Sequence, residues 1–171
     1  MEGVLPPFAP VPSYEAMGED MGQLFRSMRD PVSGRELIIE QNMFVNGILP
    51  SLINRSLSEE AQSAYEAPYR DPEDRLPIWM WPREVPIGGE PASSVAVMER
   101  IQAFMEETKK PVLLLYAEPG AVVPLASVEW YKETIAEIET SFIGQGLHFV
   151  QEDQPVAIGR ALDDWLRRHS D

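Results

Sequence analysis

The chain has 171 residues, 44% of them hydrophobic and 25% charged, which is the balance of a globular protein with a sizeable core. Its formal net charge of -14 argues against a nucleic-acid partner, because phosphate binding requires clustered Lys and Arg, and it favours a neutral substrate. Neither a long apolar run nor a signal peptide is visible, and the absence of cysteine excludes disulfides. We therefore expect a cytoplasmic protein with no membrane partner.

The first part of the chain reads as helical after an extended, Pro-rich lead-in over residues 1–12. A helix is predicted from Ser13, and a second over residues 35–47, which ends at a Gly and Pro stop signal. A third begins at Ser56 or Ser58, where Ser56 and Glu59 fit a capping box, and it closes at Pro68. The first of these helices takes its apolar stripe from Met17, Met21, Leu24, Phe25 and Met28.

Residues 78–91 read as irregular, and a fourth helix follows Pro91. The pattern then changes. Residues 111–116 form a short apolar run typical of a strand buried on both faces. A helix is predicted over residues 127–139, a short strand near 141–143, and a last helix over 155–168. Because two parallel strands are too small a sheet to be stable alone, we expect further strands upstream of residue 1.

The chain has two histidines, and only one stands where chemistry is expected. His169 lies in the charged C-terminal tail and is predicted to be solvated. His148 follows the second predicted strand, and functional groups gather at the carboxyl ends of parallel strands. A histidine there can act as a general base, although a loop histidine with no chemical task is the alternative.

Three long segments in the right order resemble haloalkane dehalogenases of the α/β-hydrolase superfamily. Residues 144–155, Gly-Gln-Gly-Leu-His-Phe-Val-Gln-Glu-Asp-Gln-Pro, resemble the segment with the catalytic histidine, and residues 156–160 resemble the start of the final helix. Residues 37–50 resemble a helix of the cap domain and the turn after it. Residues 81–91 are similar to the return from cap to core.

The resemblance implies an incomplete α/β-hydrolase fold, with a helical cap followed by the last β-α-β-α of the core sheet. Residues 1–12 would be the lead-in from a core strand, residues 13–85 the cap and residues 86–171 the C-terminal part of the core. No segment matches the family's nucleophilic Asp. The implied partner is therefore the missing N-terminal core segment, and the isolated chain is expected to be inactive.

Family members displace halide with an Asp carboxylate, and a His-activated water then hydrolyses the alkyl-enzyme ester without metal or cofactor. The resemblance makes His148 this base. It makes Glu2 the acid that orients His148, as in the dehalogenase subgroup that uses Glu, because the superfamily's other position for this acid aligns near Gly120. Glu118 is the reserve candidate, and a disordered terminal Glu2 is the alternative.

An apolar substrate cavity is implied by the cap and by the loop after residues 111–116. Such a cavity suits a small neutral halogenated substrate, although ordinary core packing is the alternative for each residue. Three other functions stay open: a coelenterazine-type luciferase, an epoxide hydrolase, which Gly120 disfavours, and a non-catalytic binding module or complementing fragment. The residues that match cavity positions are Phe25, Phe44, Ile48, Leu52 and Val122.

Overall fold

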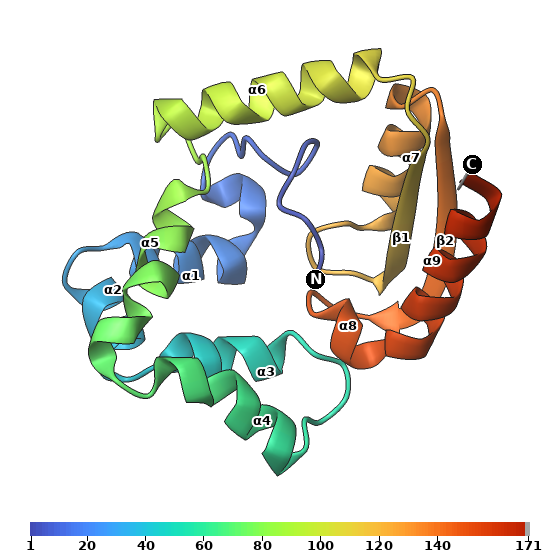
Figure 1. Ribbon diagram of the computed structural model, residues 1–171. Coiled ribbons are helices and arrows are strands. Elements are labelled where there is room, and N and C mark those ends of the chain that lie inside the picture. Colours follow the sequence, from blue (N-terminus) through green and yellow to red (C-terminus); the bar gives the residue numbers. More distant parts are fainter. Residues whose placement is uncertain (170–171) are drawn as a thin grey trace. The chain divides into compact units, whose positions relative to one another are not determined.

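The computed structural model describes residues 1–169, and the chain divides into two compact units (Figure 1). Unit 1 contains Met1–Phe8, Leu52–Ser56 and the described residues from Arg100 onward, and unit 2 contains Ala9–Ser51 and Leu57–Glu99. Short 3-10 and π-helical segments are labelled η. The elements are η1 (Glu15–Met17), α1 (Glu19–Arg29), α2 (Ser33–Arg35), η2 (Glu36–Glu40), η3 (Phe44–Ile48), α3 (Leu49–Ser51), α4 (Glu59–Glu66), η4 (Ala67–Tyr69), η5 (Pro72–Arg75), α5 (Leu76–Glu84), α6 (Ala92–Glu107), β1 (Val112–Pro119), α7 (Leu125–Thr134), β2 (Ile138–Gly146), α8 (Val150–Asp153) and α9 (Pro155–His169).

Unit 2 is built from short helices whose ends follow the local sequence. Acidic residues occupy the first turn of α1 and basic residues its last turn, which suits the helix dipole. The helix predicted from Ser13 is in fact two elements, η1 and α1, because Gly18 between them has a φ of 84°. The third helix begins after Ser58 rather than Ser56, because the Ser58 side chain accepts the Ala61 N–H at 3.1 Å.

Two expectations for unit 2 are wrong. The single helix over residues 35–47 is interrupted between η2 and η3 at Asn42, whose φ of 52° is left-handed and stops a helix. Residues 78–84, predicted to be irregular, belong to helix α5. Pro77 lies in the first turn of α5, where its missing N–H has no partner to lose, and only Pro82 stands inside the helix, two residues before its end at Glu84.

A buried arginine holds several chain segments of unit 2 together. Arg75 is 8% exposed, and its guanidinium donates to three backbone carbonyls: Tyr69 at 2.8 Å, Ile39 at 2.6 Å and Arg70 at 2.6 Å. These carbonyls lie at the ends of η2 and η4, where helical oxygens lack partners within the helix. The planar fork of Arg75 matches three oxygens at once.

We expect Arg75→Ala to lower the free energy of unfolding by about 3 kcal/mol, because the buried carbonyl of Ile39 and the part-buried carbonyls of Tyr69 and Arg70 lose a charged donor. Urea denaturation of the purified chain, followed by circular dichroism, measures this loss. Arg70→Ala is the matched control, since the Arg70 side chain is exposed and its carbonyl is unchanged. Equal stability of the two variants would contradict the prediction.

Unit 1 contains a two-stranded parallel sheet, in which β1 pairs with β2 from Val112 opposite Ile138 to Pro119 opposite Gly146. Helices α7 and α9 cover opposite faces of this sheet (Figure 1). The order β-α-β-α of the sequence prediction is confirmed. A buried cluster between α7 and the loop before it forms the core of the unit: Val122, Val123, Val128, Tyr131 and Ile135.

Two boundaries in unit 1 differ from expectation. Helix α7 ends at Thr134, and β2 already begins at Ile138, which was assigned to the helix. The apolar spacing of Ile135 and Ile138 fits a helix face, but branched side chains also favour extended chain beside a sheet. Residues 112–116 of β1 are only partly buried rather than buried on both faces, since β1 has a strand neighbour on one side. No helix within residues 1–169 is long and apolar enough to cross a membrane.

Candidate functional site

Glu2 and His148 lie against each other in unit 1. The Oε2 atom of Glu2 is 3.3 Å from Nδ1 of His148, and the side chains are 6% and 9% exposed. A second link joins the backbones, because the N–H of Glu2 donates to the carbonyl of His148 at 2.9 Å. A carboxylate only accepts hydrogen bonds, so this contact requires the ring proton on Nδ1 and leaves Nε2 free to accept a proton.

The Glu2 carboxylate is held in a cradle of backbone N–H groups after β1. Oε2 accepts from Val122 at 2.8 Å, Oε1 accepts from Val123 at 3.0 Å, and the N–H of Ala121 lies 3.1 Å from both oxygens. Successive N–H groups that point at one anion form a strong and oriented binding site. These backbone N–H groups are sufficient to hold the carboxylate in place without the hydrogen bond from His148.

Gly120 makes room for this carboxylate. Its φ is 67°, and a Cβ atom at this position would lie 2.8 Å from Oε1 of Glu2 and 2.8 Å from the carbonyl oxygen of Val123. Both the backbone angle and the space therefore require glycine. The position where the resemblance placed the superfamily's usual acid is thus adjacent to the Glu2 carboxylate.

The pKa of Glu2 is set by two opposing effects. Burial disfavours the charged carboxylate and raises the pKa, but hydrogen bonds from His148 and from the N–H groups of Val123, Val122 and Ala121 outweigh it. The net pKa lies below the ordinary value of 4.5. Glu2 is therefore ionised at neutral pH, as a partner for an Nδ1–H group must be.

We expect Glu2 to make the stability of the chain sensitive to acid. Because its pKa is lower in the folded state than in the unfolded state, its contribution is complete above the ordinary value of 4.5 and is lost as the pH falls through the folded pKa. Glu2→Gln removes the pH-dependent part of the free energy of unfolding that comes from the Glu2 carboxylate. Urea denaturation of both proteins between neutral pH and about pH 3 should show wild-type stability falling more steeply, and parallel curves would contradict the assignment.

The other predicted site residues are divided between the units. Val122 is 7% exposed and donates to Glu2, and the Leu52 carbonyl accepts the N–H of Phe149 at 3.2 Å, so both lie beside the Glu2–His148 pair. Phe25, Phe44 and Ile48 belong to unit 2, on α1 and η3. Their place in a substrate cavity stays a prediction.

Glu118 and His169 are not part of this arrangement. The Glu118 side chain is exposed near the end of β1, whereas Glu2 contacts His148. His169 was expected to be merely solvated, but it stacks on Trp165 with ring centroids 4.6 Å apart, and its Nε2 lies 3.3 Å from a Glu139 oxygen. It belongs to helix α9, because the helix continues one residue further than predicted.

Two features of the site escaped the sequence reasoning. One is the N–H cradle, which no side-chain pattern reveals. The other is Asp153, whose carboxylate accepts the N–H groups of Asn54, Arg55 and Leu147. The acidic pair Glu152 and Asp153, separated from Pro155 by one residue, was the available signal, because carboxylates near helix starts often bind backbone N–H groups.

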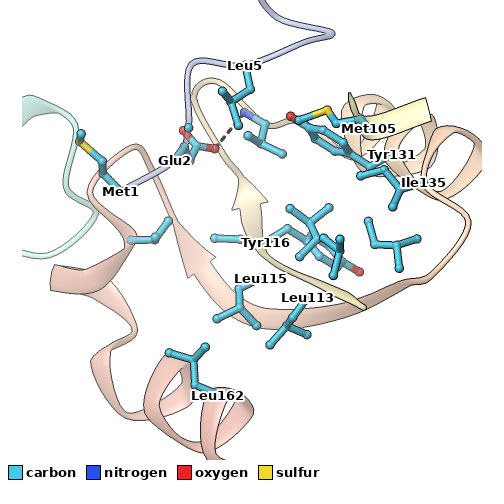
Figure 2. A pocket seen from close by; sticks show the side chains of 17 residues that line it. Met1, Glu2, Leu5, Met105, Leu113, Leu115, Tyr116, Tyr131, Ile135 and Leu162 are labelled. Carbon is cyan, nitrogen blue, oxygen red and sulfur yellow. Dashed lines mark hydrogen bonds between the residues drawn. The ribbon is translucent and has the colours of Figure 1, made fainter. Parts of the chain in front are cut away.

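An apolar cleft of about 370 Å³ runs along the unpaired edge of β1 and reaches Glu2. Six consecutive strand residues, 112–117, line it, which is possible only along a strand edge because side chains alternate between faces. Figure 2 shows Leu113 and Leu115 on the side of Leu162 from α9, with Tyr131 from α7 and Ile135, which directly follows α7, on the other. Within residues 1–169, no three His, Cys, Asp or Glu side chains form a metal-binding group.

The chain is similar in sequence to haloalkane dehalogenases. It is 37% identical over 143 residues to that of Bradyrhizobium diazoefficiens, covering 84% of this chain and 46% of the relative. It is 37% identical over 161 residues to that of Mycolicibacterium smegmatis, covering 90% and 49%. The chain therefore spans about half the length of the curated relatives it matches, and no protein-family model matches it.

The solved structures agree. The haloalkane dehalogenase of Bradyrhizobium elkani superposes with a TM-score of 0.88 at 36% identity, over 92% of this chain and 55% of that one. Agreement of fold and sequence over nearly the whole of this chain, together with the paired Glu2 and His148, leads to one conclusion. The chain is homologous to the C-terminal part of haloalkane dehalogenases and has the α/β-hydrolase fold of that part.

Proposed function

We propose that this chain supplies the histidine base and its orienting carboxylate to a hydrolytic haloalkane dehalogenase. The observation that carries the proposal is the Glu2–His148 contact at 3.3 Å, with both side chains almost completely buried and the carboxylate fixed by backbone N–H groups. A histidine held in this way has one fixed tautomer and a free ring nitrogen, which is the arrangement that a general base needs.

In the proposed reaction, an Asp carboxylate from outside this chain displaces halide from the substrate carbon and forms an alkyl ester. His148 then takes a proton from water through Nε2 while the water oxygen attacks the ester. The alcohol leaves, the Asp carboxylate is regenerated, and Glu2 stabilises the cationic ring during the step. Because no part of this chain matches the nucleophile, we propose that the chain alone is inactive.

We further propose that the substrate is a small neutral haloalkane bound in an apolar cavity. Unit 2 would be the cap, close to the predicted span of residues 13–85. The residues that match cavity positions of the family would provide apolar surface for the substrate: Phe25, Phe44, Ile48, Leu52 and Val122. A lining of this kind suits a ligand with few hydrogen-bonding groups, and the net charge of -14 disfavours anionic ones.

The proposed partner is the N-terminal core segment of a dehalogenase, with a strand that pairs with the free edge of β1. Two observations support it. The cleft of about 370 Å³ follows this edge and is lined mainly by apolar side chains. Leu162, which lines the cleft, is also 41% exposed, and an apolar side chain exposed beside an open strand edge is typical of an interaction surface. We propose that the assembled protein is cytoplasmic.

Complementation tests the proposal. The chain is mixed or co-expressed with the half of the Mycolicibacterium smegmatis relative that it does not match, and bromide release from a short bromoalkane is followed. We expect no release from either half and steady release from the assembled pair. An assembled pair that emits light with coelenterazine and releases no bromide would instead favour the luciferase function. A chain that melts alone as a sharp two-state monomer would favour an independent binding module.

A further inference from the structure

Three successive residues around His148 are anchored through their backbones to three different segments. The N–H of Leu147 donates to Oδ2 of Asp153 at 3.3 Å, and the His148 carbonyl accepts the N–H of Glu2 at 2.9 Å. The N–H of Phe149 donates to the Leu52 carbonyl at 3.2 Å. The peptide plane after His148 is thereby held by two bonds, and the plane that precedes Leu147 is held by the third, which restricts the backbone that directs the His148 side chain.

Asp153 joins two of these anchors. Its Oδ1 accepts the N–H of Arg55 at 3.0 Å, its Oδ2 accepts the N–H of Leu147, and the N–H of Asn54 lies 3.0 Å from both oxygens. The carboxylate therefore ties the segment Leu52–Ser56 to the turn that carries His148. An ion pair between Arg55 and Glu152, 2.7 Å apart, reinforces the same junction.

The close approach of Asp153 to this turn depends on Gly146. A Cβ atom at position 146 would lie 3.3 Å from Oδ2 of Asp153 and 3.2 Å from Cβ of Ala117, which is tighter than ordinary packing. Glycine therefore leaves the space that the carboxylate uses. The contact between Nδ1 of His148 and Glu2 is 3.3 Å, near the upper limit for a hydrogen bond, so a small rotation of the turn would break it.

We propose that Asp153 is a positioning residue, whose carboxylate holds the His148 turn against the Leu52–Ser56 segment and so keeps the ring aligned with Glu2. The proposal deepens the proposed function, because it assigns how the base is oriented. Its test does not need catalysis, so failure of either idea can be recognised separately. Asp153 itself does not contact the reacting atoms.

The experiment measures the tautomer of His148 in the ¹⁵N-labelled 171-residue chain, assembled with the unlabelled partner segment of the complementation test. Long-range proton–nitrogen correlation spectra, recorded at about pH 9 so that histidine rings are neutral, distinguish Nδ1–H from Nε2–H. His169→Gln in every sample leaves His148 as the only labelled histidine. The reference protein should show mainly Nδ1–H. Asp153→Ala should reduce this population about twofold or more, because a neutral ring without an acceptor at Nδ1 favours Nε2–H.

Asp163→Ala is the matched control, since it removes a carboxylate from exposed positions of α9, where its partner is Arg167. It should leave the tautomer unchanged. A folded Asp153→Ala chain with unchanged Nδ1–H would overturn the proposal, because the ring would then be oriented without Asp153.

A second variant covers the case in which Asp153→Ala does not fold. Asp153→Asn keeps one oxygen for Asn54 and Arg55 but turns an NH₂ group toward the N–H of Leu147. Amide hydrogen exchange should then be faster at Leu147 and unchanged at Arg55, whose N–H bonds Oδ1 alone, with the same change of tautomer. Faster exchange at Leu147 without a change of tautomer would contradict the proposal.

Discussion

Replacing His148 by Asn is expected to stop steady bromide release by the complemented protein while leaving a single burst of about one bromide per active site. Displacement of halide by the Asp carboxylate forms the ester without help from the histidine. Hydrolysis of that ester needs a base for water, and loss of such a base typically costs about 10²–10⁴-fold. The ester should therefore accumulate, and intact-protein mass spectrometry should detect the added alkyl group on the partner segment.

The control for this variant is His169→Asn, which removes the other histidine, on the exposed side of α9. Its steady bromide release should match that of the unaltered pair. Steady turnover by the His148→Asn protein would refute the role of His148 as base. Loss of both the burst and the turnover would indicate a different failure, because the displacement step does not depend on this histidine.

Replacing Glu2 by Ala is expected to lower the free energy of unfolding by about 3 kcal/mol, because three N–H groups lose a charged acceptor and two of their residues are buried. The summed free energy of the lost hydrogen bonds is larger than this value. Part of it is offset, because removing the carboxylate also removes the free-energy cost of burying its charge. Urea denaturation at neutral pH measures the change. In the complemented protein, the same variant should also slow ester hydrolysis, since the His148 ring loses its orienting acceptor.

Glu118→Ala is the informative control for Glu2, because Glu118 was the reserve candidate for the same role and its side chain is exposed near the end of β1. Its stability should stay within about 0.5 kcal/mol of the unaltered chain. Equal losses for the two variants would mean that the N–H cradle contributes little to stability. A larger loss for Glu118 would contradict the description of the site.

The sequence alone was sufficient for the features that depend on local pattern. The apolar run at residues 111–116 and the apolar spacing of the helices on either side of the second strand are local signals, so the order of strands and helices in unit 1 followed from them. The segment around His148 also carried the family resemblance, because a likeness to one family over twelve consecutive residues, 144–155, rarely arises by chance. The start of α4 was ambiguous between Ser56 and Ser58, since both lie within one turn of the helix.

Only the tertiary structure decided which carboxylate meets His148 and what holds the histidine turn in place. Glu2 lies at the opposite end of the chain from His148, and their contact arises because the N–H groups of residues 121–123 collect the carboxylate after β1. Asp153 is similar, because its partners Asn54 and Arg55 are distant in sequence. Backbone N–H groups are identical in every residue except proline, so no sequence pattern reveals where three of them converge. Chain folding alone creates that charge environment.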